Sequence, residues 1–183
     1  ACAKHPAQTA VPNEPVTAQK AITELRRQSE ALGFDNALEE LEEKNTATIG
    51  GDTYIRLQQH YEGIPVYGKT IVYGANENGE LTTVTGNVQD IDPDIDLTPT
   101  ITPEQAQESI RAYAAEVLGM ENAEEITIAE LRKEDLYIFD SSSQDTLAYC
   151  IDLGVHTFIC DAHFAQVLAH HNSSYADTVI YTN

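Results

Sequence analysis

The sequence predicts an α+β protein of two small modules, each with a helix packed on an antiparallel sheet. Twice along the chain, a capped amphipathic segment precedes residues that alternate between apolar and polar side chains. Between the two halves, residues 90–99 combine alternating aspartates with two prolines, which is typical of an acidic linker. The 183 residues are enough for two such modules, each with a core of its own.

The first module, residues 17–89, opens with a helix. Thr17 is a suitable cap for a helix over about residues 18–32, where apolar side chains recur at helical spacing, and Gly33 marks its end. A short helical piece rich in glutamate is predicted next, over 36–44.

Strands complete this module. Alternation predicts them over 54–61, 70–73 and 81–84. Gly63 and Gly68 bracket a short connection that contains Pro65, and Asn78-Gly79 is typical of a type I′ hairpin turn. The result is an antiparallel meander.

The second module, residues 100–171, starts with a clear helix signal. Thr102 is the cap, Pro103 takes the first helical position, Gln105 closes a capping box, and Gly119 ends the helix. The buried stripe is expected to comprise Ala106, Ile110, Tyr113, Ala114 and Val117. Strands are predicted over 125–131, 136–139, 147–152, 157–161 and 166–170.

The charge of the chain limits its partners. Its net charge is −20, which repels nucleic acid and anionic membrane surfaces. No apolar run approaches the roughly 20 residues that span a bilayer. The acidity serves solubility, or docking to a less acidic partner, and we favour the first interpretation.

Residues 1–16 are expected to form a flexible leader. Cys2 follows a small residue, as the acylated cysteine does in bacterial lipoproteins. A lipid anchor at Cys2 and a free cysteine in the leader both remain open.

Two further cysteines lie in a predicted hairpin. We expect a hairpin that turns near residues 153–155 to place Cys150 opposite Cys160. Cα atoms of facing strand residues are about 4.5 to 5.5 Å apart, within the range that a disulfide accepts. A disulfide and two buried thiols are both open, and a zinc site is disfavoured because no second cysteine pair accompanies them.

The alternating aspartates of the linker could suggest calcium. A calcium loop would need a central glycine and a glutamate at its twelfth position, where Ile101 stands. A solvated acidic connector is therefore the favoured interpretation.

A spaced set of residues carries a family resemblance. The spacing is Arg-x-x-Gln-x-Tyr-x-Gly-x-Pro-Val-x-Gly, and the residues are Arg56, Gln59, Tyr61, Gly63, Pro65, Val66 and Gly68. The run resembles the fungalysin/thermolysin propeptide module in the pro-region of secreted thermolysin-like zinc proteases. The resemblance favours a paired role for Arg56, with a carboxylate across the sheet or at the module interface, over a snorkelling surface role.

The second module resembles the PepSY domain that follows this module in such precursors. The resemblance is carried by 102–106, Tyr149, Ile151, Phe158, Ile159, Asp161-Ala162 and Val167-Leu168. The family continues Asp-Ala with a Thr-Gly-Glu turn, where this chain has Phe164, Ala165 and Gln166. The glycine that takes positive φ is missing, so we expect a rebuilt turn.

The sequence lacks catalytic signatures. It has no His-Glu-x-x-His zinc motif, no Gly-x-Ser-x-Gly elbow and no glycine-rich phosphate loop. The resemblance therefore implies a non-catalytic, cofactor-free pro-region that inhibits the catalytic domain of a thermolysin-like zinc protease and assists its folding. It also implies a secreted or cell-envelope location in a bacterium. The alternative is a free-standing envelope lipoprotein that binds a protease or a cell-wall component.

The resemblance places a processing junction near the tail, residues 172–183. We expect an inhibitory segment there, made of His170, His171, Asn172 and Ser173. One of the two histidines would present a neutral imidazole to the zinc of the partner. Ordinary solvated histidines at a strand end are the alternative.

Overall fold

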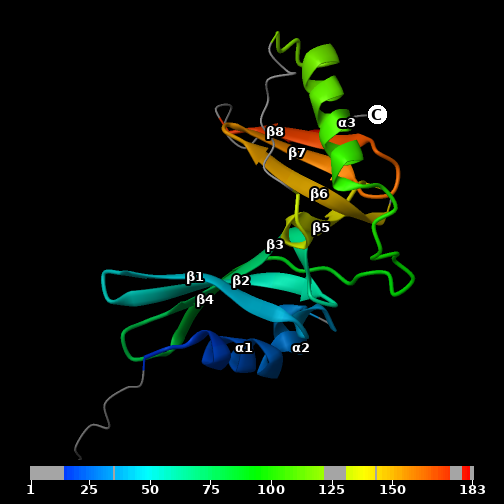
Figure 1. Cartoon of the computed structure of the whole chain (residues 1–183). Helices are drawn as coiled ribbons and strands as arrows, with labels where there is room; N and C mark the ends of the chain where they lie inside the picture. Colours follow the sequence, from blue (N-terminus) through cyan, green and yellow to red (C-terminus); the bar gives the residue numbers. More distant parts are fainter. Residues whose placement is uncertain (1–14, 35, 122–130, 143, 174–178, 182–183) are drawn as a thin grey trace, which may run out of the picture. The chain divides into compact units, whose positions relative to one another are not determined.

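The structure is a computed structural model that describes residues 15–34, 36–121, 131–142, 144–173 and 179–181 (Figure 1). The chain divides into two compact units. Unit 1 comprises Ala1–Gln59 and Lys69–Val88, and unit 2 comprises His60–Gly68 and Gln89–Asn183. Each unit combines helix with antiparallel strands, so the predicted α+β class is confirmed.

The helices of unit 1 begin where the sequence predicts. The unit contains α1 (Ala18–Arg27), α2 (Ser29–Leu32), η1 (Asn36–Leu38), β1 (Leu41–Ile49), β4 (Leu81–Gly86) and most of β2 (Asp52–Tyr61) and β3 (Ile64–Ala75). The Thr17 side chain accepts a hydrogen bond from the backbone N–H of Lys20 at 3.3 Å, which confirms the predicted cap. The single predicted helix is divided at Gln28, and Gly33, with φ 76°, ends the second piece.

Strand β1 corrects the prediction of a glutamate-rich helix over 36–44. Only the one-turn η1 is helical there, and β1 pairs antiparallel with β2. Leu41 is the only buried residue of β1, so the strand has no apolar alternation to reveal it. Gly50 and Gly51, both with positive φ, form the turn that brings β2 back against it.

The turn between β3 and β4 also differs from the prediction. Gly79 has φ 80°, but Asn78 does not adopt the positive φ that a type I′ turn needs at both central residues. Instead, the Asn76 side-chain oxygen accepts hydrogen bonds from the backbone N–H groups of Asn78 and Glu80, each at 3.0 Å. The loop is therefore longer and held by an asparagine.

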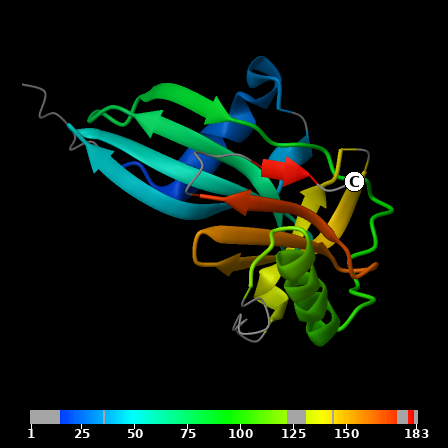
Figure 2. The same cartoon turned by 90° about the horizontal axis from the view of Figure 1, so that it is seen from above.

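The core of unit 1 lies between α1 and one face of its sheet (Figure 2). Alternate residues of β2 and β3 face the helix because side chains of a strand alternate between faces. The buried members are Ala21, Ile22, Leu25, Leu38, Leu41, Ile55, Leu57, Ile71, Tyr73 and Ala75.

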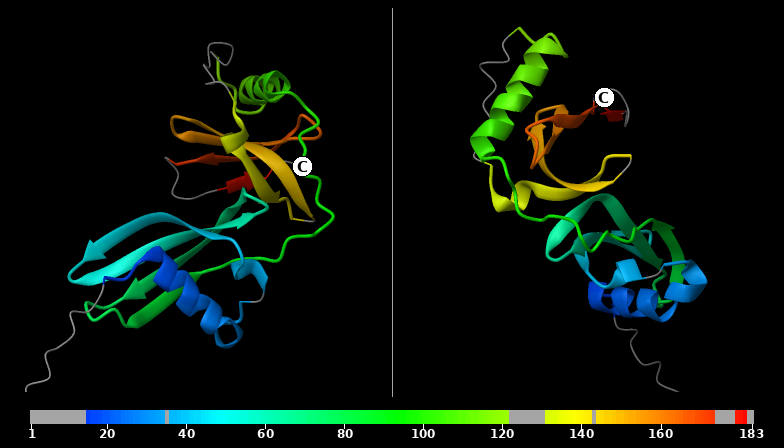
Figure 3. Two further views of the ribbon diagram at one scale, coloured as in Figure 1. Left: turned by 60° about the horizontal axis from the view of Figure 1, so that its bottom comes forward. Right: turned by 90° about the vertical axis from the view of Figure 1, so that its right-hand side faces the viewer.

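Unit 2 places α3 on one face of an antiparallel sheet (Figure 3). Its elements from residue 89 on are α3 (Pro103–Glu116), η3 (Lys133–Asp135), β5 (Leu136–Asp140), β6 (Asp145–Leu153), β7 (His156–Asp161), β8 (Val167–Asn172) and β9 (Val179–Tyr181). Strands β5 to β9 pair in chain order, and the first strand also receives a parallel pairing from Val66 to Ile138. The sequence predicted β5 to β8. It missed β9, and its predicted strand over 125–131 lies almost wholly outside the described residues.

The predicted capping box of α3 is present. The Thr102 hydroxyl accepts from the Gln105 N–H at 3.2 Å, and the Gln105 side chain accepts from the Thr102 N–H at 2.8 Å. Ala106, Ile110 and Ala114 are fully buried, as expected, but Val117 is 63% exposed because it caps the end of the helix.

The acidic linker belongs to unit 2 and packs against it. The Gln89 side-chain amide donates to the Asp145 carboxylate at 2.7 Å, and Leu97 contacts the core beneath α3. The backbone N–H groups of Thr100 and Ile101 both donate to the Ala162 carbonyl. Residues 90–99 are therefore held on the sheet rather than spanning solvent between modules.

Candidate functional site

The propeptide-like residues build a hairpin. Glu62 and Gly63, with φ 49° and 80°, form a two-residue turn of type I′ between β2 and β3. Tyr61 ends β2. Pro65 lies within β3, which corrects the prediction of an irregular connection there.

Most of the motif serves the architecture. Gln59 and Val66 are 2% and 1% exposed, and Val66 makes the pairing to Ile138. Gly68, with φ 71°, lies within β3, where a side chain would be strained. The hairpin is thus a preformed element, not a catalytic constellation.

Arg56 does not take the paired role that we expected. It is exposed on β2, opposite Asn45 of β1, and no ion pair is found for it in the part of the chain that the structure describes. Its neighbours Ile55 and Leu57 point into the core, so the strand period places Arg56 on the outer face. The surface alternative fits the structure.

Of the two alternatives left open for Cys150 and Cys160, the structure has free thiols and no disulfide. Both are free: Cys150 faces Ile159 and Cys160 faces Tyr149, so the register is one residue away from the expected one. A shift of one residue places the two thiols on opposite faces of the sheet. Burial raises the pKa of each thiol to about 12, which favours the protonated, unreactive form.

The segment expected to be an inhibitory tail is partly inside the sheet. His170, His171 and Asn172 belong to β8, which pairs with β7 and with β9, and the Ser173 hydroxyl donates to the Val155 carbonyl at 3.2 Å. His170 is 4% exposed, so it does not fit the predicted zinc-presenting role while β8 is folded. Such a role for the half-buried His171 stays a prediction.

His170 instead joins a cluster of rings beneath α3. Its ring centroid lies 6.0 Å from Tyr113, 5.9 Å from Phe158 and 5.9 Å from His156. Desolvation by burial, together with the nearby His156 and His171, lowers the pKa of His170. The sequence did not reveal this cluster, because the strand register alone brings residues 156 and 170 together.

The turn from Asp161 to Gln166 is held by side-chain hydrogen bonds and contains a left-handed residue other than glycine. The Asp161 carboxylate accepts from the backbone N–H groups of His163 at 2.7 Å and Phe164 at 3.2 Å. Ala165 takes φ 43°, and its carbonyl accepts from the Ser109 hydroxyl at 2.7 Å. Alanine thus occupies the left-handed position for which the resemblance implies a glycine, and the expectation of a rebuilt turn stays a prediction.

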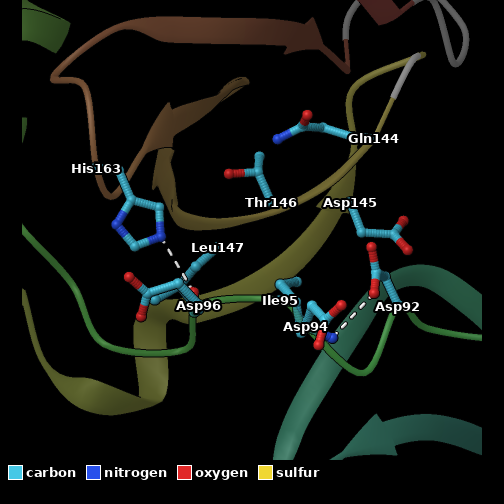
Figure 4. Close-up of a pocket in the computed structure, with 9 residues that line it drawn as sticks. All are labelled: Asp92, Asp94, Ile95, Asp96, Gln144, Asp145, Thr146, Leu147 and His163. Carbon is cyan, nitrogen blue, oxygen red and sulfur yellow. Dashed lines mark hydrogen bonds between the residues drawn. The ribbon is translucent and has the colours of Figure 1, made fainter.

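An acidic pocket of about 280 Å³ lies beside this turn in unit 2 (Figure 4). Its lining comprises Asp92, Asp94, Ile95, Asp96, Gln144, Asp145, Thr146, Leu147 and His163. One ring nitrogen of His163 is 2.9 Å from the Thr100 hydroxyl, and the other is 3.1 Å from the Asp96 carbonyl oxygen. Within the described ranges, no three ligand-type side chains are placed to hold a metal ion.

Two other sequence predictions concern attachment to a membrane. Cys2 lies outside the described residues, so its lipidation stays a prediction. Among the residues that the structure describes, no helix has the length and apolarity needed to cross a membrane.

Comparison with known proteins agrees with the hairpin motif. Residues 39–88 match the family described as the Fungalysin/Thermolysin Propeptide Motif. Bacillolysin of Bacillus cereus is 28% identical over 134 residues, which are 68% of this chain and 22% of that protein. Hemagglutinin/proteinase of Vibrio cholerae serotype O1 is 31% identical over 114 residues, 61% of this chain and 18% of that protein. The chain thus spans about a fifth of the length of these relatives.

A solved structure, the Bacillus megaterium YpeB C-terminal domain, aligns with 95% of this chain and 70% of its own length, at 13% identity and a TM-score of 0.39. The PepSY resemblance of unit 2 stays a prediction. For residues 39–88 the match is to a propeptide motif and not to a catalytic domain, in agreement with the absence of catalytic signatures in the sequence. Residues 39–88 of the chain therefore carry a fungalysin/thermolysin propeptide motif, and the chain is similar to part of Bacillolysin and of hemagglutinin/proteinase.

Proposed function

We propose that this chain is a pro-region that inhibits the catalytic domain of a thermolysin-like zinc metalloprotease and acts as its intramolecular chaperone. The observation that carries the proposal is the propeptide motif over residues 39–88, which builds the folded sheet β1 to β4. We also propose an extracytoplasmic location, secreted or in the envelope of a bacterium.

The physics of a folded pro-region suits this role. A ligand that binds the native state but not the unfolded state stabilises the native state by mass action. A preformed surface loses little conformational entropy on binding, so more of its contact energy remains available for the partner. Both units have packed cores, and each can present such a surface.

The acidic charge supports encounter more than final affinity. With a net charge of −20, long-range attraction to a less acidic partner speeds association, and salt screens it over about 10 Å. We expect added salt to slow association more than it speeds dissociation, because packed contacts are screened little.

The test is refolding in trans. A denatured thermolysin-like catalytic domain is refolded with and without this chain, and recovered activity is measured after the chain is removed. We expect higher recovery and, with the native enzyme, slow and tight inhibition. A matched control is the Gly86→Ala variant, whose substitution disturbs the β3–β4 pairing. If the folded chain produces no rescue and no inhibition, the proposal is overturned and the envelope-lipoprotein alternative is favoured.

A further inference from the structure

Two imidazoles lie together in the layer between α3 and the sheet of unit 2. His156 starts β7 and His170 lies in β8, one step away diagonally, since His170 pairs with Phe158 and His156 with Asn172. Their ring centroids are 5.9 Å apart. Phe158 stacks on both, at 6.0 Å from His156 and 5.9 Å from His170.

The polar atoms of this pair are not satisfied by the protein. The Nδ1 atoms of His156 and His170 are both buried, and neither has a hydrogen-bond partner among the described residues. A neutral imidazole can leave one nitrogen as an unpaired acceptor, but a protonated ring carries two N–H donors. Protonation would therefore add a charge and an unpaired donor where water is excluded.

The surroundings offer the extra charge no compensation. From α3, the titratable side chain facing the pair is that of Tyr113, and β6 contributes the apolar Ile151 and Leu153 to the same core. On β8, the neighbouring His171 lowers the pKa of His170 further, and no carboxylate in the described part of the chain counters it. On β9, the backbone partner of His170 is Ile180. The ring faces of Phe158 and Tyr113 attract a cation, whereas burial and the neighbouring His156 and His171 lower the pKa of His170.

We propose that His170, packed against His156 and Phe158, forms an acid-sensitive latch, which holds α3 on the sheet while its ring is neutral and loosens α3 when it is protonated. The inference concerns unit 2 itself and does not depend on the proposed partner.

The sign of the effect follows from linkage. An unfolded histidine has a pKa of about 6.5, and that of His170 in the folded unit is lower. Below about pH 6.5, the open state therefore binds more protons than the closed state, so acid favours opening. Above that pH, the contribution of His170 to stability is fully present.

Amide hydrogen exchange of α3 tests the latch on the full chain, with protection factors corrected for the intrinsic pH dependence. Helix α1 is an internal reference, because no described residue of unit 1 is a histidine. Between pH 7.5 and pH 5, we expect the protection of α3 to fall relative to α1 by about tenfold for each unit by which folding lowers the pKa of His170.

Two variants make the test specific. His170→Phe fills the site with a ring that cannot titrate, and we expect it to remove most of the relative loss of protection. His171→Gln changes the adjacent residue of the same strand, on the other face, and should retain most of the loss. An undiminished loss in His170→Phe, or no loss in the unsubstituted chain, would overturn the proposal.

A spectroscopic measurement covers the case in which His170→Phe does not fold. Ring-proton NMR titration of the unsubstituted chain gives the midpoint for each histidine. We expect the His170 resonance to titrate below the ordinary histidine value of about 6.5. A midpoint at or above the ordinary histidine value would overturn the latch.

Discussion

The two units differ in how they fill left-handed backbone positions. In the described part of unit 1, every residue with positive φ is a glycine: Gly33, Gly50, Gly51, Gly79 and Gly86. Unit 2 also uses glycine, but three other residues share this conformation: Glu62, Ser142 and Ala165. A side chain at such a position costs about 1 to 2 kcal/mol relative to glycine. In unit 1 glycine occupies the left-handed positions, so these turns are unstrained, whereas three turn residues of unit 2 are strained.

The cores show a parallel difference. The buried core of unit 1 consists of aliphatic residues and Tyr73, while unit 2 packs an imidazole pair with unpartnered nitrogens against its aromatic residues. Strain and buried polar atoms both lower local stability. Unit 2 is therefore the unit we expect to open first, and local opening is where ligand and pH control usually act.

The largest expected effect on stability comes from replacing Gly86 of unit 1, a glycine with positive φ, by alanine. Gly86 has φ 104°, and a Cβ there would lie 2.1 Å from the backbone oxygen of Thr70. Because backbone must move, Gly86→Ala should cost more than about 3 kcal/mol of unfolding free energy. Urea unfolding measures it, with the exposed neighbour substitution Thr85→Ala as control. A loss below about 1 kcal/mol would contradict the close approach.

Turn strain in unit 2 predicts an effect of opposite sign. Ala165→Gly should stabilise by about 1 kcal/mol, since Ala165 has φ 43°. Gly154→Ala in unit 2 and Gly33→Ala in unit 1 should each cost a similar amount of stability, because both glycines have positive φ. An added Cβ at either site meets no atom within 4 Å, so no steric clash adds to this cost. These matched substitutions isolate backbone conformation. A loss of stability in Ala165→Gly would show that Ala165 is not strained.

The comparison also explains what the sequence could predict. Strong local signals gave the right answer: Thr17 and Thr102 cap helices, and the Arg56-to-Gly68 spacing indicated the propeptide motif. Strand β1 was missed because eight of its nine residues are exposed, so it lacks the alternation that reveals strands. The His156 and His170 pair was missed because it depends on the pairing register of β7 and β8. A slip of one residue changes that register, and the local sequence specifies it only weakly.

A smaller effect tests the outer face of unit 1. Arg56 is exposed and lies opposite Asn45, so Arg56→Ala should shift the melting temperature by no more than about 1 °C. Leu57→Ala, the buried neighbour, is the control and should cost about 2 to 5 kcal/mol. A loss of several kcal/mol in Arg56→Ala would restore the paired role that the family resemblance favours.

The smallest effect is expected for the cysteines of unit 2. A disulfide closing a short loop would contribute on the order of 2 to 3 kcal/mol, so reductant would lower the melting temperature by several degrees. Since Cys150 and Cys160 face Ile159 and Tyr149, we expect reductant to shift the melting temperature by less than about 1 °C. Both thiols should resist alkylation in the native chain at pH 8, because burial raises their pKa to about 12, and should react once urea unfolds it. A reductant-dependent transition would require the β6–β7 register to slip by one residue. Such a slip would also turn the core-facing side chains of one strand outward, so it would disrupt unit 2 and not merely add a bond.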